Sequence, residues 1–292
     1  MFQNIGIFGK YVGNQCWDNI ETLIQFLQSK SKTVFLDDTS CHDFPSQQYN
    51  IELIERSQLS KKIDLAIVVG GDGTFLDVAR SIVDDGVPIL GINLGRLGFL
   101  TDISPDNMLE SLEEILAGVY EEERRNLLKV NVYEQGACVF EQIAMNDIVI
   151  YKTDSPRMIE FETLVDGRFL NSQRSDGLII STPTGSTAYA LSAGGPILDP
   201  GLDAISLVSI NPHTMSTRPY VIGGNSEVEL RPHENCDKVA QIICDGQISH
   251  PISPKHRTIV KRNPKYITLL HPKGHDHFEL LRAKLRWGDK LS

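Results

Sequence analysis

The turn GGDGT at residues 70–74 is the first stretch of the chain whose residue types could do chemistry. An apolar run, Leu65 to Val69, leads into the turn, and a helical pattern follows it. Glycine lets a ligand approach the backbone closely, so the turn could hold phosphate with its N–H groups. The N-terminus of the following helix would also favour an anion. The alternative is a strand that merely changes direction.

Asp72 is the unusual member of this turn. The GxxxxGK[ST] phosphate loop is absent from the chain, and the GxGxxG fingerprint that begins at Gly71 meets Leu76 in place of its third glycine. Phosphate repels a carboxylate, unless that carboxylate accepts a proton from an attacking hydroxyl or shares a divalent cation with the phosphate. Both cases indicate phosphoryl transfer to an alcohol. The alternative is that Asp72 only caps the helix.

A second glycine-rich segment, GINLGRLGFLTD at residues 91–102, follows a predicted strand. Ligands of open α/β sheets bind at such strand ends. Phe99 could flank a base or a nicotinamide ring, or it could be an ordinary core residue within a glycine-rich turn.

A third segment, SDGLIISTPTGSTAYALSAGGP at residues 175–196, places four hydroxyl residues around Gly185. Such hydroxyls suit ribose or phosphate, and Tyr189 offers a face for stacking. A purely structural turn is the alternative. The absence of a GxSxG context argues against a serine hydrolase.

Three smaller features complete the candidate chemistry. Asn146-Asp147 interrupts a β pattern and could bind sugar hydroxyls, or could be a bulge. Arginines near these segments, Arg157 and Arg174 among them, could neutralise phosphate. The sequence His275-Asp276-His277 has no third metal ligand at a supporting spacing, so we expect an exposed turn there.

Composition limits the class of protein. The 292 residues are 41% hydrophobic and 23% charged, which is ordinary for a globular protein. A net charge of −10 argues against a nucleic-acid partner. Five cysteines without a CxxC pair indicate a reducing compartment. With neither a membrane-length apolar run nor a secretory signal, we expect a cytoplasmic protein without a membrane partner.

The first part of the chain alternates strands and helices, which predicts an α/β domain with a parallel sheet. The helices are expected after a cap at Asp18, over Phe75–Val83, and from Ser104-Pro105. The strands are expected over Gln3–Phe8, Thr33–Leu36, Asp64–Val69 and Val87–Ile92.

The remainder predicts a β-rich, mainly antiparallel domain with hairpins at Asp166-Gly167 and Asp245-Gly246. A C-terminal segment with Phe278, Leu281 and Leu285 at helical spacing would return to the first domain. The expected domains are 1–122, 123–275 and 276–292. Four of the expected strands are Glu227–Leu230, Val239–Cys244, Thr258–Val260 and Tyr266–Leu270.

Taken together, the motifs resemble the NAD kinase family over nearly the whole chain. The ordered set is GGDGT (70–74), GINLGRLGFLTD (91–102), AMND (144–147), QRSDGLIISTPTGSTAYALSAGGP (173–196) and CDGQ (244–247). The resemblance implies transfer of the ATP γ-phosphoryl group to the 2′-hydroxyl of the adenosine ribose of NAD, giving NADP, with Mg²⁺ or another divalent cation. The alternatives are a lipid kinase of the diacylglycerol type, which shares GGDGT, and a non-catalytic dinucleotide sensor.

The resemblance also implies roles for individual residues. Asp72 would be the general base, and Asn146 and Asp147 would hold ribose hydroxyls. The family often has Asn-Glu at that pair, so Asp147 is a departure, shorter by one methylene. The metal ligands are not specified, and a homodimer or homotetramer joined mainly by the β-rich domain is implied. The other residues implied to bind substrate are Gly73, Arg157, Arg174, Asp176, Thr187, Ala188, Tyr189, Ala190, Leu191, Ser192 and Gln247.

Overall fold

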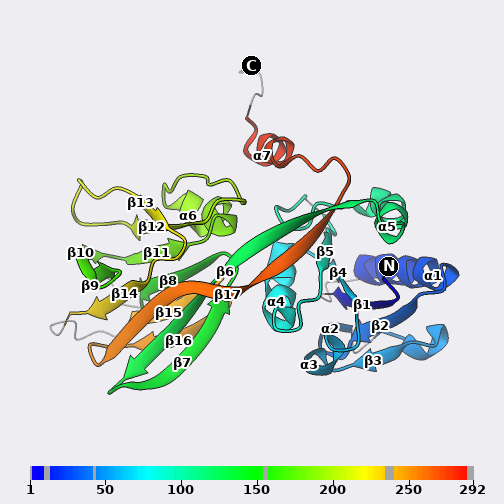
Figure 1. The fold of residues 1–292 in the computed structure, drawn as a ribbon, viewed down its shortest axis with the longest axis horizontal. Coiled ribbons are helices and arrows are strands. Elements are labelled where there is room, and N and C mark those ends of the chain that lie inside the picture. Colours follow the sequence, from blue (N-terminus) through cyan, green and yellow to red (C-terminus); the bar gives the residue numbers. More distant parts are fainter. Residues whose placement is uncertain are drawn as a thin grey trace. The chain divides into compact units, whose positions relative to one another are not determined.

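The computed structural model describes residues 2–9, 14–41, 44–95, 97–153, 157–233 and 240–287. The chain forms two compact units (Figure 1). Unit 1 comprises Met1–Arg124 and Ile267–Ser292, and unit 2 comprises Arg125–Tyr266. The expected domain limits fell after residues 122 and 275. The boundary between the units after Arg124 lies within strand β6 (Tyr120–Glu134). The boundary after Tyr266 lies within strand β17 (His256–Pro272).

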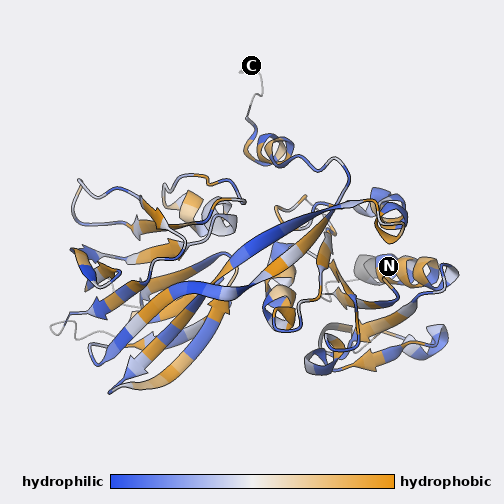
Figure 2. Ribbon diagram, in the orientation of Figure 1, coloured by the Kyte–Doolittle hydropathy of each residue, from blue (hydrophilic) through white to orange (hydrophobic). Residues whose placement is uncertain are grey.

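Unit 1 contains the expected parallel sheet, with strand order β3-β2-β1-β4-β5-β17. Buried strands such as LAIVV of β4 are apolar throughout because both faces of the sheet are covered (Figure 2). Strand order reverses between β1 and β4, and ligands of open α/β sheets bind at the carboxyl ends of strands there. The strands are β1 (Asn4–Gly9), β2 (Thr33–Asp37), β3 (Glu52–Ile54), β4 (Leu65–Val69), β5 (Ile89–Ile92) and the end of β17.

Helices cover this sheet by their apolar faces. In α1 (Asn14–Ser29), four buried aliphatic residues pack in the cluster that contains Ile5 and Ile7 of β1. Since α1 begins at Asn14, the expected cap at Asp18 is wrong. Helix α5 (Met108–Leu116) joins the same cluster, whereas α4 (Asp72–Ile82) buries residues outside it. The short helices are α2 (Asp38–Cys41), η1 (Ser46–Tyr49), α3 (Arg56–Leu59) and η2 (Pro105–Asn107).

Unit 2 is antiparallel, as expected. One set of strands runs β10-β9-β14-β17 with β6 paired to β7 and β17, and a six-stranded sheet runs β13-β12-β11-β8-β15-β16. Inward-facing residues of both sets form one core, Leu128, Ile148 and Phe161 among them. The new strands are β7 (Ala137–Ala144), β8 (Asp147–Lys152), β9 (Ile159–Val165), β10 (Arg168–Ser175), β11 (Gly177–Ser181), β12 (Ala204–Ile210), β13 (Tyr220–Gly223), β14 (Val228–Pro232), β15 (Ala240–Cys244) and β16 (Ile248–Ile252).

Both hairpins expected at Asp-Gly pairs are present. Asp166 and Gly167 have φ of 51° and 73°, and Asp245 and Gly246 have φ of 50° and 66°. Two consecutive positive φ angles match the twist of the flanking antiparallel strands, and Asp-Gly tolerates them. The pairs connect β9 to β10 and β15 to β16.

The C-terminal segment differs in detail from its prediction. Thr258–Val260 and Tyr266–Leu270, expected as two strands, are parts of the single strand β17. Helix α7 (His277–Leu285) begins at Asp276, whose side chain accepts the N–H of Phe278 at 2.8 Å. Of the three residues at helical spacing, Leu281 is buried, Leu285 is half-buried and Phe278 is 63% exposed, and Leu280 is buried beside Leu281. Among the described residues, no helix is long and apolar enough to cross a membrane.

Candidate active site

The GGDGT turn lies at the carboxyl end of β4, where the strand order of unit 1 reverses. Gly71 is extended at the helix boundary, and Asp72 is the first residue of α4. The N-cap residue Gly71 has no side chain to cap this helix, and Gly73 is exposed in its first turn. The N-terminus of a helix suits an anionic ligand.

The Asp72 carboxylate is held by the loop that follows β5. Its Oδ2 accepts the N–H of Phe99 at 2.9 Å, and its Oδ1 accepts the N–H of Leu100 at 3.0 Å and the hydroxyl of Thr101 at 3.2 Å. The helix-capping alternative for Asp72 is therefore wrong. A carboxylate has about four acceptor positions, so about one position stays available to a ligand.

Gly98 is required by this arrangement. A Cβ atom at Gly98 would lie 2.1 Å from Asp72 Oδ1 and 2.3 Å from the Thr101 hydroxyl. The GGDGT turn and the 91–102 segment, which the sequence presents as two motifs, are thus one structure. Phe99 is half-buried, with the Lys284 ammonium 5.6 Å from its ring centroid. Arg96 of the same segment lies outside the described residues.

In unit 2, a bend at Met145 and Asn146 separates β7 from β8, and Asp147 is the first residue of β8. The Asp245 carboxylate anchors this bend, because it accepts the N–H groups of Met145, Asn146 and Asp147 at 3.0, 2.7 and 3.2 Å. In return the N–H of Asp245 donates to the Asp147 carbonyl at 2.9 Å. The hairpin turn after β15 therefore fixes the backbone of the bend.

The side chains of the pair are left available to a ligand. Among the described residues, no hydrogen bond reaches the Asn146 amide or the Asp147 carboxylate. Asp147 is only 4% exposed, and burial together with the nearby Asp245 carboxylate raises its pKa to about 7. A buried acceptor without an internal donor is costly for the fold, and this pair is well suited to receive polar groups of a ligand.

The hydroxyl-rich loop packs directly on this bend. Thr182 donates its hydroxyl to the Met145 carbonyl at 2.6 Å, and a Cβ at Gly185 would lie 2.1 Å from the Asn146 carbonyl oxygen. The Ser186 hydroxyl donates to the Pro183 carbonyl at 2.6 Å. Ser186 and Thr182 are buried, so these hydroxyls brace the loop itself; the sequence had suggested that they face a ligand.

Tyr189 begins the short helix α6 (Tyr189–Ser192), which follows the 3₁₀ turn η3 (Thr184–Thr187). Partial burial and the nearby Tyr151, Asp147 and Asp176 raise the pKa of the Tyr189 phenol. Tyr189 is 42% exposed, so part of the residue is accessible to a ligand. Of the other residues expected here, Ala190 is buried, Ser192 is exposed, and Thr187, Ala188 and Leu191 are half-buried.

The remaining expected residues are placed as follows. The Asp176 carboxylate lies 2.6 Å from the Lys152 ammonium and accepts the Asn211 amide at 3.0 Å, and these bonds lower its pKa. Arg157 and Arg174 are exposed, in the bend before β9 and in β10 respectively. Gln247 is exposed in the turn that contains Asp245.

Three residues that hold candidate site residues in place are not singled out by the sequence. The sequence marks Asp245 as a hairpin residue within the quoted CDGQ motif, and no local signal indicates its bonds to residues 145–147. Thr101 lies within a quoted motif, but its bond to Asp72 spans 29 positions in the sequence. Lys152, the partner of Asp176, ends a strand and carries no local signal.

Comparison with known proteins agrees with this architecture. Residues 15–120 match the model of the ATP-NAD kinase N-terminal domain, and residues 145–271 match that of the ATP-NAD kinase C-terminal domain. Both halves thus indicate one class of phosphotransferase. An NAD kinase of Hydrogenovibrio crunogenus is 64% identical over 100% of both chains, and one of Nitrosococcus oceani is 47% identical over 99% of this chain and 98% of the relative. The chain belongs to the NAD kinase family.

Two solved structures share the fold. The crystal structure of yeast NADH kinase complexed with NADH superposes with a TM-score of 0.89 at 24% identity, covering 99% of this chain and 89% of that one. An NAD kinase from Archaeoglobus fulgidus in complex with ATP gives a TM-score of 0.74 at 25% identity, covering 97% and 99%.

Proposed function

We propose that this protein is an NAD kinase, which transfers the γ-phosphoryl group of ATP to the 2′-hydroxyl of the adenosine ribose of NAD. The reaction forms NADP and ADP, and the hydroxyl proton must be accepted as the new P–O bond forms. Phosphoryl transfer needs an aligned acceptor, neutralisation of charge and a group that takes this proton.

The placement of Asp72 carries the proposal. The side chain stands at the carboxyl end of β4 and at the start of α4, where a phosphate would bind, yet it is not used to cap the helix. Three donors from one loop fix its orientation and leave about one acceptor position. We assign Asp72 as the general base for the ribose hydroxyl, with Gly73 beside it.

The bend at Asn146 and Asp147 supplies the ribose contacts in this proposal. Both side chains lack internal hydrogen bonds among the described residues, and Asp245 holds their backbone in place. Tyr189 would stack on a ring of the dinucleotide. Residues Arg157, Arg174, Asp176, Thr187, Ala188, Ala190, Leu191, Ser192 and Gln247 are proposed as further substrate contacts on the basis of family resemblance.

A divalent cation, Mg²⁺ for example, belongs to the proposed reaction. The one acceptor position left on Asp72 is assigned to the ribose hydroxyl, so a cation would be held mainly by phosphate oxygens. Such an ion neutralises charge on the transferred group. Cys41, Cys138 and Cys244 are free thiols, which supports a cytoplasmic location. A homo-oligomer joined through unit 2 completes the proposal.

The direct test incubates the purified chain with NAD, ATP and Mg²⁺ and measures NADP with an NADP-specific dehydrogenase. We expect NADP to form, and Asp72→Asn to lower kcat by roughly 10²–10⁴-fold, the usual contribution of a general base. Asn keeps the size of the side chain, but its NH2 group cannot accept a hydrogen bond, so we expect one of the two backbone bonds from Phe99 and Leu100 to be lost as well.

Asp106→Asn is the matched control, because Asp106 is an exposed aspartate of unit 1 whose side chain has no hydrogen bond or ion pair with the described residues. It should leave kcat unchanged. Absence of NADP with the wild-type chain would overturn the proposed activity. Near-normal turnover of Asp72→Asn would overturn only the assignment of the base.

A further inference from the structure

Two histidines and an aspartate, all outside the proposed active-site residues, converge within unit 1. Asp102 lies in the loop after β5, His271 near the end of β17, and His275 in the turn before α7. The sequence suggested an exposed turn at His275 because no third ligand stood nearby in the chain. The structure brings two partners to it from other segments.

The three side chains present their donor atoms to one point. The Nδ1 atoms of His271 and His275 each lie 2.8 Å from Asp102 Oδ2, and all three donor atoms lie within 4.8 Å of one another. The imidazole rings stack with centroids 3.9 Å apart and planes at 21°. Both rings therefore direct the same nitrogen to the same carboxylate oxygen.

The polar atoms of this cluster are also buried. The side chains of His271, His275 and Asp102 are 3%, 14% and 10% exposed. Nε2 of His275 is buried without a hydrogen bond among the described residues, whereas Nε2 of His271 faces Glu123. Buried imidazoles are normally hydrogen-bonded or metal-bound, and both Nδ1 atoms face the Asp102 carboxylate.

Glu123 of β6 stands where the outer carboxylate of a metal-bound histidine is usually found. Its Oε2 lies 3.2 Å from Nε2 of His271, on the side of the ring opposite Asp102. A histidine that binds a metal through one nitrogen commonly directs the other N–H towards a carboxylate, which orients the ring. His271 follows this pattern, because its Nε2 faces Glu123 and its Nδ1 faces Asp102.

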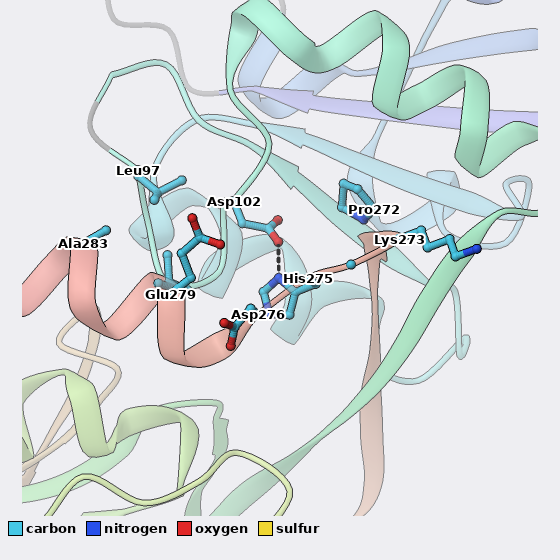
Figure 3. A pocket seen from close by; sticks show the side chains of 10 residues that line it. Leu97, Asp102, Pro272, Lys273, His275, Asp276, Glu279 and Ala283 are labelled. Atoms are coloured by element: carbon cyan, nitrogen blue, oxygen red, sulfur yellow. Dashed lines mark ion pairs between the residues drawn. The ribbon is translucent and has the colours of Figure 1, made fainter.

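An open position adjoins the cluster. A cavity of about 280 Å³ is lined by Asp102, His275, Gly274, Asp276 and Glu279, along with apolar residues and Lys273. In Figure 3 the Lys273 side chain points away from the Asp102–His275 pair. The cavity gives a metal ion an entry path and room for a water ligand.

We propose that Asp102, His271 and His275 form a site for one divalent transition-metal ion of the zinc type, with Glu123 supporting His271. Two imidazole nitrogens and a carboxylate oxygen suit such an ion, whereas Mg²⁺ prefers oxygen ligands alone. Ligand bonds of about 2.0–2.1 Å in tetrahedral geometry put neighbouring donor atoms about 3.3 Å apart. Each Nδ1 atom therefore moves about half an ångström away from Asp102 Oδ2 as the metal takes the place of the Nδ1 protons. The two stacked rings must also turn, so that both Nδ1 lone pairs point at the same ion.

The site would fasten three segments of unit 1 to one another: the loop after β5, the end of β17 and the start of α7. Asp102 directly follows Thr101, whose hydroxyl donates to Asp72. The metal is thus structural, and distinct from the cation that accompanies ATP.

The test titrates Zn²⁺, and Co²⁺ as a spectroscopic probe, into the untagged, chelator-treated full chain without NAD or ATP. We expect one equivalent of Zn²⁺ to bind, Co²⁺ to give visible absorption bands of a nitrogen- and oxygen-ligated ion, and Zn²⁺ to raise Tm. His275→Gln should weaken Zn²⁺ binding at least tenfold and abolish the rise in Tm. His213→Gln, which changes an exposed histidine of unit 2, should leave both unchanged.

Absence of one-equivalent binding by the wild-type chain overturns the site, and so does wild-type affinity in His275→Gln. If His275→Gln does not fold, the Co²⁺ spectrum of the wild type decides, since oxygen-only ligation overturns the proposal. Asp72→Asn should bind Zn²⁺ like the wild type, which separates this result from the fate of the proposed kinase activity.

Discussion

Asp147 is a buried carboxylate that the protein itself leaves without a hydrogen-bond donor among the described residues. Burial first, and the Asp245 carboxylate second, raise its pKa to about 7. The charged form is therefore disfavoured in the folded, unliganded protein. A ribose hydroxyl that donates to this carboxylate would relieve part of that cost, since it supplies the missing donor.

The raised pKa predicts a dependence of stability on pH. The folded state binds more protons than the unfolded state between pH 4 and 7, so Asp147 costs stability progressively as pH rises through this window. Asp147→Asn cannot ionise and should avoid that cost. The upper limit at pH 8 is roughly 4 kcal/mol, at about 1.4 kcal/mol per pKa unit.

Urea unfolding of wild type and Asp147→Asn at pH 5 and pH 8 checks this expectation. The variant should gain stability relative to the wild type as pH rises. A difference in unfolding free energy that is the same at both pH values would show that the carboxylate is not destabilised by its surroundings.

At the scale of elements, two hairpin turns of the same Asp-Gly sequence have different tasks. The Asp166 carboxylate accepts one N–H group at 2.8 Å, that of Glu227, which directly precedes β14. The Asp245 carboxylate instead accepts the three N–H groups of residues 145–147. The turn after β15 is therefore an anchor for the proposed ribose contacts as well as a chain reversal.

Asparagine replacements should separate these two tasks, because asparagine also tolerates the positive φ of the turn. Asp245→Asn keeps the hairpin but weakens the anchor, and should raise KM for NAD by roughly tenfold, the effect of losing about 1.4 kcal/mol of binding. Steady-state kinetics measure this change. Asp166→Asn is the matched control, and an equal rise in KM there would show that the anchor is unimportant.

The sequence predicts the elements better than their contacts. Alternation of apolar strands with amphipathic helices indicated the parallel sheet, and Asp-Gly pairs indicated both hairpins, because these signals are local. The strand β3 has only three residues and was missed. The bond between Asp72 and the loop at residues 99–101, the anchor at Asp245 and the Asp102–His271–His275 cluster all join distant segments, and no local pattern encodes them.

At the scale of the molecule, apolar side chains are exposed on strands at the ends of the two sheets of unit 2. Phe169 and Leu170 of β10 are 62% and 38% exposed, and Tyr220 and Val221 of β13 are 54% and 42% exposed. Uncovered strand edges with apolar residues favour association with another chain. These surfaces support the proposed homo-oligomer.

Light scattering coupled to size-exclusion chromatography tests the assembly. The wild-type chain should have the mass of a dimer or tetramer, and the combined change Phe169→Ser with Tyr220→Ser should reduce that mass. Phe278→Ser, at a residue that is 63% exposed on α7 of unit 1, should not. A monomeric wild type, or an assembly indifferent to the double change, would contradict the proposed interface.

The passage of β17 through both units has a consequence for how the protein is made. Its end pairs with β5 through Leu269 and Ile89, so the sheet of unit 1 is completed by residues near the C-terminus. On the ribosome, residues 1–124 emerge first but keep an open strand edge, while residues 125–266 are synthesised as one uninterrupted stretch. The β-rich unit can thus finish folding before the α/β unit that precedes it, an exception to the N-terminal-first order of most multidomain chains.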